Sequence, residues 1–149
     1  MTAVSGCWKW LPLMMLAPTL GLIGCSGRAD RTFNPAEERL LTISNAYLLA
    51  ASKLDRAPTG FEDIKPYLAG TDSEEILVSP NDGEKFVIIW GVDYHKLKPA
   101  RENPFTIGGY ERKGTAGKRY VLRYPRSVVL MTDEELGKAV FPAGHKFPE

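Results

Sequence analysis

The stretch that decides the fold is residues 34–55, which read NPAEERLLTISNAYLLAASKLD. Asn34 offers an N-cap oxygen, Pro35 suits the first helical position, and the pair Glu37-Glu38 complements the positive end of a helix dipole. Apolar side chains then recur at helical spacing in one wide stripe: Leu40, Leu41, Ile43, Ala46, Tyr47, Leu48, Ala50, Ala51 and Leu54. The sequence predicts a long, well-buried helix that ends near Asp55.

A second, short helix is predicted directly after the first. Thr59 and Glu62 have the spacing of a capping box, and apolar residues follow at helical intervals to Leu68. Pro66 limits this helix to one or two turns.

Beyond residue 74 the pattern changes from helix to strand. Residues 75–79 are predicted to be extended, and Asn81-Asp82-Gly83 predicts a turn. Phe86–Trp90 is a dense run of β-branched and aromatic residues, interpreted as a central strand that is buried on at least one face. Further strands are predicted at 105–112, 119–124 and 127–131. Gly108-Gly109 predicts a bulge or a close approach to the backbone.

The C-terminal part starts with a capping box, Thr132-x-x-Glu135, which predicts a last short helix. The tail 142–149 has the composition of a loose end. Helices and strands are segregated along the chain, so the predicted fold class is α+β. We expect a long N-terminal helix packed on a small antiparallel sheet of three to four strands, with a short C-terminal helix.

The N-terminal segment has the features of an export signal. Lys9 precedes an apolar run, Leu11–Ile23, that is shorter than the roughly 20 residues of a bilayer-spanning helix. The run closes with Leu22-Ile23-Gly24-Cys25, which resembles the lipobox of bacterial lipoproteins. That resemblance implies a signal peptide, 1–24, cleaved after Gly24, and a lipid with fatty acids such as palmitate on Cys25. The alternatives are an ordinary secretory signal with a chance cysteine, or a misassigned start codon.

A polar tether, 25–33, then leads into a single domain, 34–149. Cys7 and Cys25 are the only cysteines, so the mature domain is expected to have no free thiol and no disulfide. The chain of 149 residues has a formal net charge of +1, which implies no strong attraction to nucleic acid.

The order of elements resembles the globular heads of type II secretion pseudopilins and related type IV pilin-like proteins. The resemblance rests on the helix 34–55, the segment 61–68, Ser79-Pro-Asn-Asp-Gly83 leading into a strand, and the strands after Gly117-Lys-Arg-Tyr120. The mature region is also similar to small lipoproteins of planctomycete-type bacteria. Two features of the family are missing: the leader followed by a long apolar helix, and the calcium loop of some major pseudopilin heads, since Gly91–Tyr94 offers one acid.

No motif for catalysis or for a cofactor is present. There is no Gly-x-Ser-x-Gly elbow, P-loop or Gly-x-Gly-x-x-Gly, and the two histidines, His95 and His145, are too few and too far apart in sequence to predict a metal site. We therefore expect no catalytic residue, no metal and no cofactor.

Residues near the loop 91–104 form a candidate surface for a ligand or a partner: Trp90, Asp93, Tyr94, His95 and Tyr110. The competing interpretation places these aromatics in the core and in cross-strand pairs. Basic residues gather around one predicted hairpin: Lys113, Lys118, Arg119, Arg123 and Arg126. They are interpreted as charges that protect a sheet edge, and the alternative is a site for an acidic polymer or a lipid headgroup.

The leading hypothesis is a non-enzymatic lipoprotein of the cell envelope that serves as a structural or protein-binding module. It is expected to be exported and anchored by lipid on the periplasmic side or the outer surface, with an envelope protein as partner. The alternative is a small envelope hydrolase or ligand-binding lipoprotein, in which Asp93, His95 and Glu102 converge. A third possibility is a minor pseudopilin with an atypical leader.

Overall fold

The stretch after Asn34 folds into helix α1, Pro35–Leu54. In this computed structural model, Asn34 Oδ1 accepts a hydrogen bond of 2.9 Å from the backbone N–H of Ala36. Asp55 ends the helix in the left-handed conformation, with φ 52°. Both ends therefore lie where the local sequence predicts them.

The structure describes residues 32–68, 74–94, 96, 105–124 and 126–147, all within one compact unit, Thr32–Glu149. The predicted signal peptide, the cleavage site at Gly24 and the lipid-bearing Cys25 lie outside the described residues. Among the helices that are described, none is both long enough and apolar enough to cross a membrane.

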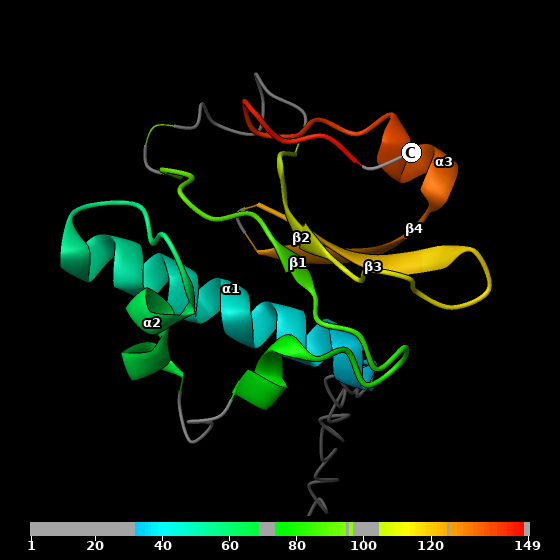
Figure 1. Cartoon of the computed structure of the whole chain (residues 1–149), viewed down its shortest axis with the longest axis horizontal. Coiled ribbons are helices and arrows are strands. Elements are labelled where there is room, and N and C mark those ends of the chain that lie inside the picture. The colour runs from blue at the N-terminus through cyan, green and yellow to red at the C-terminus, as the bar shows by residue number, and fades with distance from the viewer. Residues whose placement is uncertain (1–31, 69–73, 95, 97–104, 125, 148–149) are drawn as a thin grey trace, which may run out of the picture. The chain divides into compact units, whose positions relative to one another are not determined.

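Four strands form one antiparallel sheet in the order β1-β2-β3-β4 (Figure 1). They are β1 Val87–Ile88, β2 Ile107–Tyr110, β3 Lys118–Arg123 and β4 Ser127–Thr132. The α+β class and the small antiparallel sheet are therefore confirmed.

The position predicted for the first strand is wrong. β1 is short, half-buried and paired only with β2, so it forms an edge of the sheet instead of its centre. Ile89 adds one hydrogen bond of 2.9 Å to the carbonyl of Gly108. Gly91, at φ 77°, then turns the chain away. Pairing with β2 therefore ends before the apolar run does.

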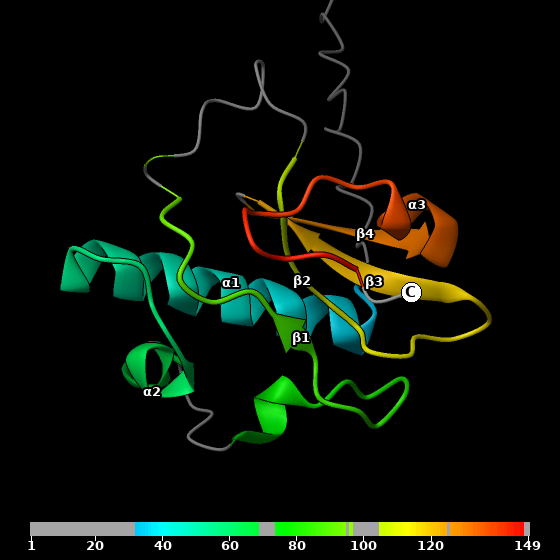
Figure 2. The ribbon, with the colours of Figure 1, turned by 45° about the horizontal axis from the view of Figure 1, so that its top comes forward.

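The sheet has a hydrophobic core on each face (Figures 1 and 2). On one face α1 packs against side chains that include Leu122, Tyr124 and Val128. On the other face the C-terminal segment, beginning with α3 (Asp133–Gly137), covers Ile107 and Val121.

The described part of the tail is not loose, contrary to the prediction. Phe147 lies edge-on to the ring of Tyr110, with 5.5 Å between ring centroids. The guanidinium of Arg119 lies 5.1 Å from the centroid of the Phe147 ring. Phe147 therefore packs the tail against the sheet through its contacts with Tyr110 and Arg119.

The short helices differ from prediction in two places. α2 (Phe61–Ile64) is capped by Gly60 without a side-chain bond, so the predicted capping box is wrong. Both the N–H and the hydroxyl of Thr59 donate to Asp63 instead, at 2.8 and 3.0 Å. The chain continues as a 3-10 turn, η1 (Lys65–Tyr67), and residues predicted as extended form a second such turn, η2 (Glu74–Leu77). At α3 the capping box is confirmed.

The glycine pair of β2 is confirmed as both a bulge and a close approach. The register with β3 shifts between Ile107 and Gly109. A Cβ atom on Gly108 would overlap the buried ring of Tyr124, and one on Gly109 would lie 2.9 Å from the carbonyl oxygen of Val87. The missing side chains leave room for Tyr124 on one side and for β1 on the other.

Candidate functional site

Trp90 and Tyr94, two of the five candidate surface residues, belong to an aromatic cluster between α1 and the sheet. The cluster consists of Tyr47, Trp90, Tyr94 and Tyr124. Tyr47 stacks on Trp90 at 5.9 Å between centroids, and Tyr94 stacks on Tyr124. Burial raises the pKa values of Tyr94 and Tyr124, so both rings stay neutral. These aromatics thus contribute to the core, with Trp90 half-buried at its margin.

The hydroxyl of Tyr47 connects α1 to the loop that carries the candidate residues. It lies 3.1 Å from the carbonyl oxygen of Val92 and 3.3 Å from that of Pro58, and it accepts a 3.0 Å bond from the N–H of Val92. Burial raises the pKa of Tyr47, so the hydroxyl keeps its proton and donates. Gly91 N–H also donates to Pro58, at 2.8 Å. The loop after β1 is therefore held against the end of α1.

Replacing Tyr47 by Phe is expected to lower the free energy of unfolding by about 1–3 kcal/mol. The ring and its packing remain, but the buried N–H of Val92 loses its acceptor. Urea unfolding, followed by circular dichroism, measures the change. The control is Tyr67→Phe, at the half-buried tyrosine of η1. Equal stability of the two variants would contradict this role for the hydroxyl.

Asp93 lies in an open hollow at the end of α1. The hollow has a volume of about 530 Å³, and its lining includes Asp55, Arg56, Asp93 and Lys96. Lys96 pairs with Asp93 at 2.9 Å, and Arg56 pairs with Asp63 at 2.9 Å. The Arg56 guanidinium holds the pKa of Asp63 well below its usual range, and the hydrogen bond that Lys96 donates to Asp93 raises the pKa of Lys96. Three of the four charged residues named in the lining, Arg56, Asp93 and Lys96, thus take part in ion pairs.

Tyr110, another candidate residue, lies away from this hollow. Tyr110 is 4% exposed and packs on the opposite face of the sheet, next to Phe141 and Phe147. His95 lies outside the described residues, as does Glu102. The structure therefore separates Tyr110 from Trp90, whereas Tyr94 packs against the cores on both faces of the sheet.

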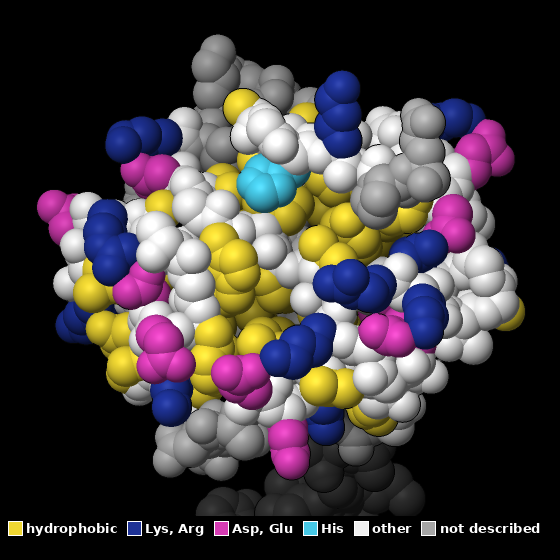
Figure 3. All heavy atoms as spheres, viewed as in Figure 1, with side chains coloured by type: hydrophobic (Ala, Val, Ile, Leu, Met, Phe, Trp, Pro, Cys, Tyr) yellow, Lys and Arg dark blue, Asp and Glu magenta, His cyan; other side chains and the backbone are white. Residues whose placement is uncertain are grey.

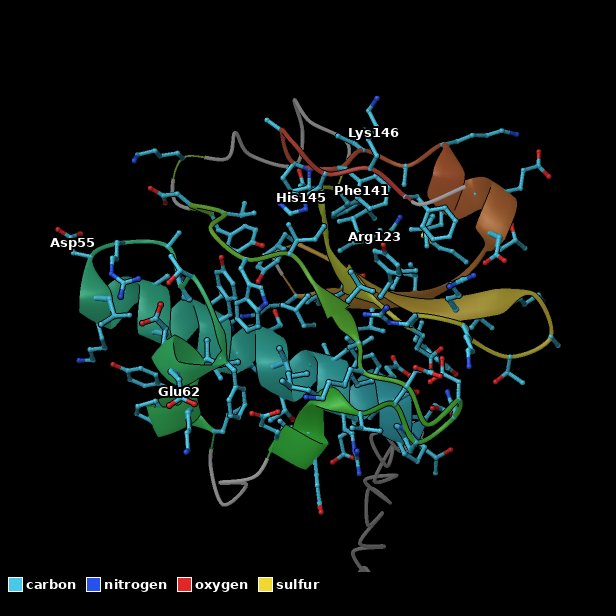
Figure 4. All side chains as sticks on the ribbon, in the orientation of Figure 1. Asp55, Glu62, Arg123, Phe141, His145 and Lys146 are labelled. Carbon is cyan, nitrogen blue, oxygen red and sulfur yellow. The ribbon has the colours of Figure 1, made fainter. Side chains whose placement is uncertain are left out.

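A second hollow lies beside the tail, with a volume of about 360 Å³ and a lining that includes Phe141, His145, Lys146 and Phe147. Figure 4 shows His145 with Lys146 and Phe141 on the side of the sheet opposite α1. Within the described residues, no three His, Cys, Asp or Glu side chains are grouped so that they could hold a metal ion. His145 is therefore not part of such a group among the described residues.

A buried carboxylate, which the sequence did not single out, organises the other end of the domain. Glu111, directly after β2, is 1% exposed. Its Oε1 accepts hydrogen bonds from the Ser79 hydroxyl (2.6 Å) and the Asn81 amide (2.9 Å), and its Oε2 accepts one from the N–H of Tyr120 (2.8 Å). Asn81 also reaches the N-cap Asn34 at 3.3 Å. This Glu111 network joins α1, the turn and the sheet, and its burial indicates a structural role.

Asp82 extends the same turn to the connection between β2 and β3. Its Oδ1 accepts a hydrogen bond of 2.9 Å from the backbone N–H of Glu84. Its Oδ2 accepts hydrogen bonds from the backbone N–H groups of Lys113 and Gly114, at 3.0 and 2.8 Å. Burial by itself raises the pKa of Asp82, but the three backbone donors and the Lys113 charge together lower it. Because the folded pKa is depressed, the carboxylate stabilises the fold above its unfolded pKa of about 3.9. This stability is lost as the pH falls through the folded pKa.

The chain matches no protein-family model, no curated protein and no solved structure.

The described surface carries mixed charge. On the face in Figure 3, acidic and basic side chains are interspersed. Lys118, Arg119 and Arg123 lie on β3, which pairs with a strand on each side, so the prediction that they protect a sheet edge is wrong. Lys113 and Arg119 form ion pairs with nearby acids. The alternative interpretation was a site for an acidic polymer or a lipid headgroup. The ion pairs of Lys113 and Arg119 argue against it, because these two charges already have partners.

Proposed function

We propose that this chain is a lipid-anchored protein of a bacterial cell envelope, with a non-enzymatic domain that serves as a structural or protein-binding module. The observation that carries the proposal is the sequence Leu22-Ile23-Gly24-Cys25 at the close of the apolar run Leu11–Ile23. Cleavage after Gly24 leaves Cys25 as the first residue, with lipid on its sulfur. The segment 26–33 then tethers the domain to the membrane surface.

The anchor accounts for the apolar run without a permanent span. Each buried CH₂ of an acyl chain contributes about 0.8 kcal/mol to membrane binding, so two or more chains form a durable anchor. Such a protein is attached to one leaflet and keeps its folded domain in water.

The described domain supports a binding role over a catalytic one. Its most deeply buried carboxylate, Glu111, is occupied by three donors. In the larger hollow, Asp93 pairs with Lys96, and Arg56 pairs with Asp63 of α2. A long helix over an antiparallel sheet is also the arrangement of a pilin-like head. We propose that likeness for the domain, with the lipid anchor in place of the pilin leader.

The second candidate is a ligand-binding lipoprotein or small hydrolase with its site at the loop 91–104. The hollow of about 530 Å³ beside Asp93 and Lys96 favours this candidate. We rank it second because the hollow is open and Asp93 is already paired with Lys96.

Replacing Cys25 by Ser is expected to abolish lipid labelling, and to leave either an uncleaved precursor or a soluble form. The change removes the only sulfur that the proposed pathway acylates. Metabolic labelling with a palmitate analogue, followed by cell fractionation, measures the effect. Cys7→Ser is the matched control, because that residue belongs to the discarded peptide and its loss leaves labelling intact. Equal label on the Cys25→Ser protein would refute the anchor.

A further inference from the structure

The two edges of the sheet differ in how well they are protected. β1 forms one edge and is only two residues long. Among the strands that the structure describes, β4 forms the other edge, with six residues, SVVLMT, that include no charge, no proline and no glycine. Natural proteins usually protect long edge strands with such residues, because unpaired N–H and C=O groups invite another strand. The edge of β4 therefore has the character of an interface.

The backbone groups at this edge follow from the hydrogen bonds inside the sheet. The carbonyl of Tyr120 accepts a 3.1 Å bond from the residue that follows β2. Bonding directions alternate along a strand, so the groups of Val121 point the other way, to its β4 partner Val129. By the same alternation, Val128 and Leu130 direct their N–H and C=O groups to the free edge.

The side chains at the edge are apolar as well. Val128 belongs to the core under α1 and is 8% exposed, whereas Leu130, two residues on and on the same face, is 50% exposed. A strand laid along this edge would cover Leu130 and satisfy the outward backbone groups in one step.

We propose that the free edge of β4 pairs with β4 of a second copy of this chain, antiparallel about a two-fold axis. In the register that uses every outward group, Val128 lies opposite Leu130 of the other copy, and the two Val129 residues face each other on the axis. Each Leu130 is then covered by Val128 of the other copy. The N–H of Thr132 is not needed, which matters because it already donates to Glu135 at 2.8 Å.

The charges at the two ends of β4 favour the same pairing. Arg126 precedes the strand, and Asp133 and Glu134 follow it in the first turn of α3. Within their own chain these two acids pair with Arg119 and Lys138, so Arg126 of the other copy would add to existing ion pairs. Antiparallel pairing places Arg126 of each copy beside the acidic turn of the other, at both ends of the interface. The chain is thus complementary to itself along this edge. This inference names the partner of the binding module proposed above, and it requires the folded domain but not the anchor.

Cross-linking of single cysteines tests the pairing and its register. The full chain is prepared in detergent with Cys7→Ser and Cys25→Ser, so that one introduced cysteine is the only thiol. Facing residues of this kind have Cα atoms about 4.5 Å apart, within the range that a disulfide bridges. Val129→Cys is therefore expected to yield a disulfide dimer under mild oxidation. Met131→Cys is the control, because its two copies lie about 13 Å apart along the strands in this register, at about 3.3 Å per residue. It should form no disulfide, although the chains still associate.

A second pair of variants separates this edge from association through the apolar N-terminus. Leu130→Lys should reduce the Val129→Cys cross-link at least tenfold, whereas Leu49→Lys, at a helix position that is 51% exposed, should leave it unchanged. Sedimentation of the cysteine-free chain, with and without Leu130→Lys, gives the mass independently of disulfide chemistry.

A monomeric mass for the chain without Leu130→Lys, equal cross-linking at positions 129 and 131, or a cross-link that persists in Leu130→Lys would each overturn the proposal. Capture of an unrelated extended peptide by a monomer would do the same. Because Cys25 is replaced in every sample, these outcomes are independent of the labelling test of the anchor.

Discussion

A chain that starts at Ala57 is expected not to fold, whereas a chain that starts at Ser26 is expected to unfold in one cooperative transition on heating. The difference between them includes all of α1. This helix supplies the buried residues Leu40, Ile43 and Tyr47 to the core on its face of the sheet. Without it, Leu122, Tyr124 and other apolar side chains would face water, and a large exposed apolar patch drives aggregation.

The helix also holds segments that are distant in sequence. The guanidinium of Arg39 donates to the carbonyl oxygens of Glu75 and Val78, at 2.8 and 2.6 Å. The hydroxyl of Tyr47 binds the backbone at Pro58 and Val92. Removal of α1 therefore frees both the turn before β1 and the loop after it, in addition to uncovering the core.

Thermal unfolding of the two proteins, followed by circular dichroism, is the measurement. The chain from Ser26 contains no cysteine, so its melting temperature should be unchanged by a reducing agent. EDTA should also leave it unchanged, since we expect no structural metal. A well-ordered sheet in the chain from Ala57 would contradict the packing of α1 on the sheet. It would also contradict the proposal of a pilin-like head, which depends on that packing.

The parts of the fold that depend on neighbouring residues were predictable. The N-cap at Asn34 and the capping box Thr132–Glu135 each arise from side chains that bond within a few residues, and α1 ends at Asp55, shortly before Pro58, as predicted. The glycine pair in β2 was also interpreted correctly, because only a missing side chain allows so close an approach.

The parts that depend on strand order were not predictable. Phe86–Trp90 has the composition of a central strand, but the composition does not specify how many strands pair with it. The basic residues of β3 resembled edge protection because the sequence did not show that β4 would lie outside them. Tyr110 was grouped with Trp90 by residue type, although the sheet separates the two.

The Glu111 network was missed for a related reason. The motif Ser79–Gly83 was interpreted as a turn, which accounts for its backbone. Its partner lies about 30 positions away, with separations of 32 residues from Ser79 and 30 from Asn81. Sequence patterns relate residues that are close along the chain and do not connect residues so far apart. A single acidic residue after a strand therefore does not predict a buried carboxylate.

Replacing Glu111 by Ala is expected to destabilise the domain by about 3–5 kcal/mol, from buried donors left unsatisfied and from the cavity. The change leaves the Ser79 hydroxyl, the Asn81 amide and the N–H of Tyr120 without their acceptor, and it opens a space in the interior. Small domains have a free energy of unfolding of about 5–15 kcal/mol. The expected loss is therefore a large fraction of the total stability of the domain.

Two further variants distinguish the carboxylate from general effects of substitution. Glu111→Gln keeps the volume but has one carbonyl oxygen, which cannot occupy both acceptor positions. We therefore expect a loss smaller than that for alanine but above about 1 kcal/mol. Glu134→Ala removes an exposed glutamate that pairs with Lys138 on the surface of α3, and its cost should stay below about 0.5 kcal/mol.

Urea unfolding of the three variants gives the order of the losses, with the slope of the transition as a check that each variant unfolds from a similar native state. If Glu111→Ala and Glu134→Ala cost the same, the three donors must find other acceptors, and the network would not hold the turn to the sheet. If Glu111→Gln is as stable as the parent chain, the contribution of Glu111 comes from its volume. The expected order, alanine above glutamine above the surface control, requires a buried carboxylate with both oxygens engaged.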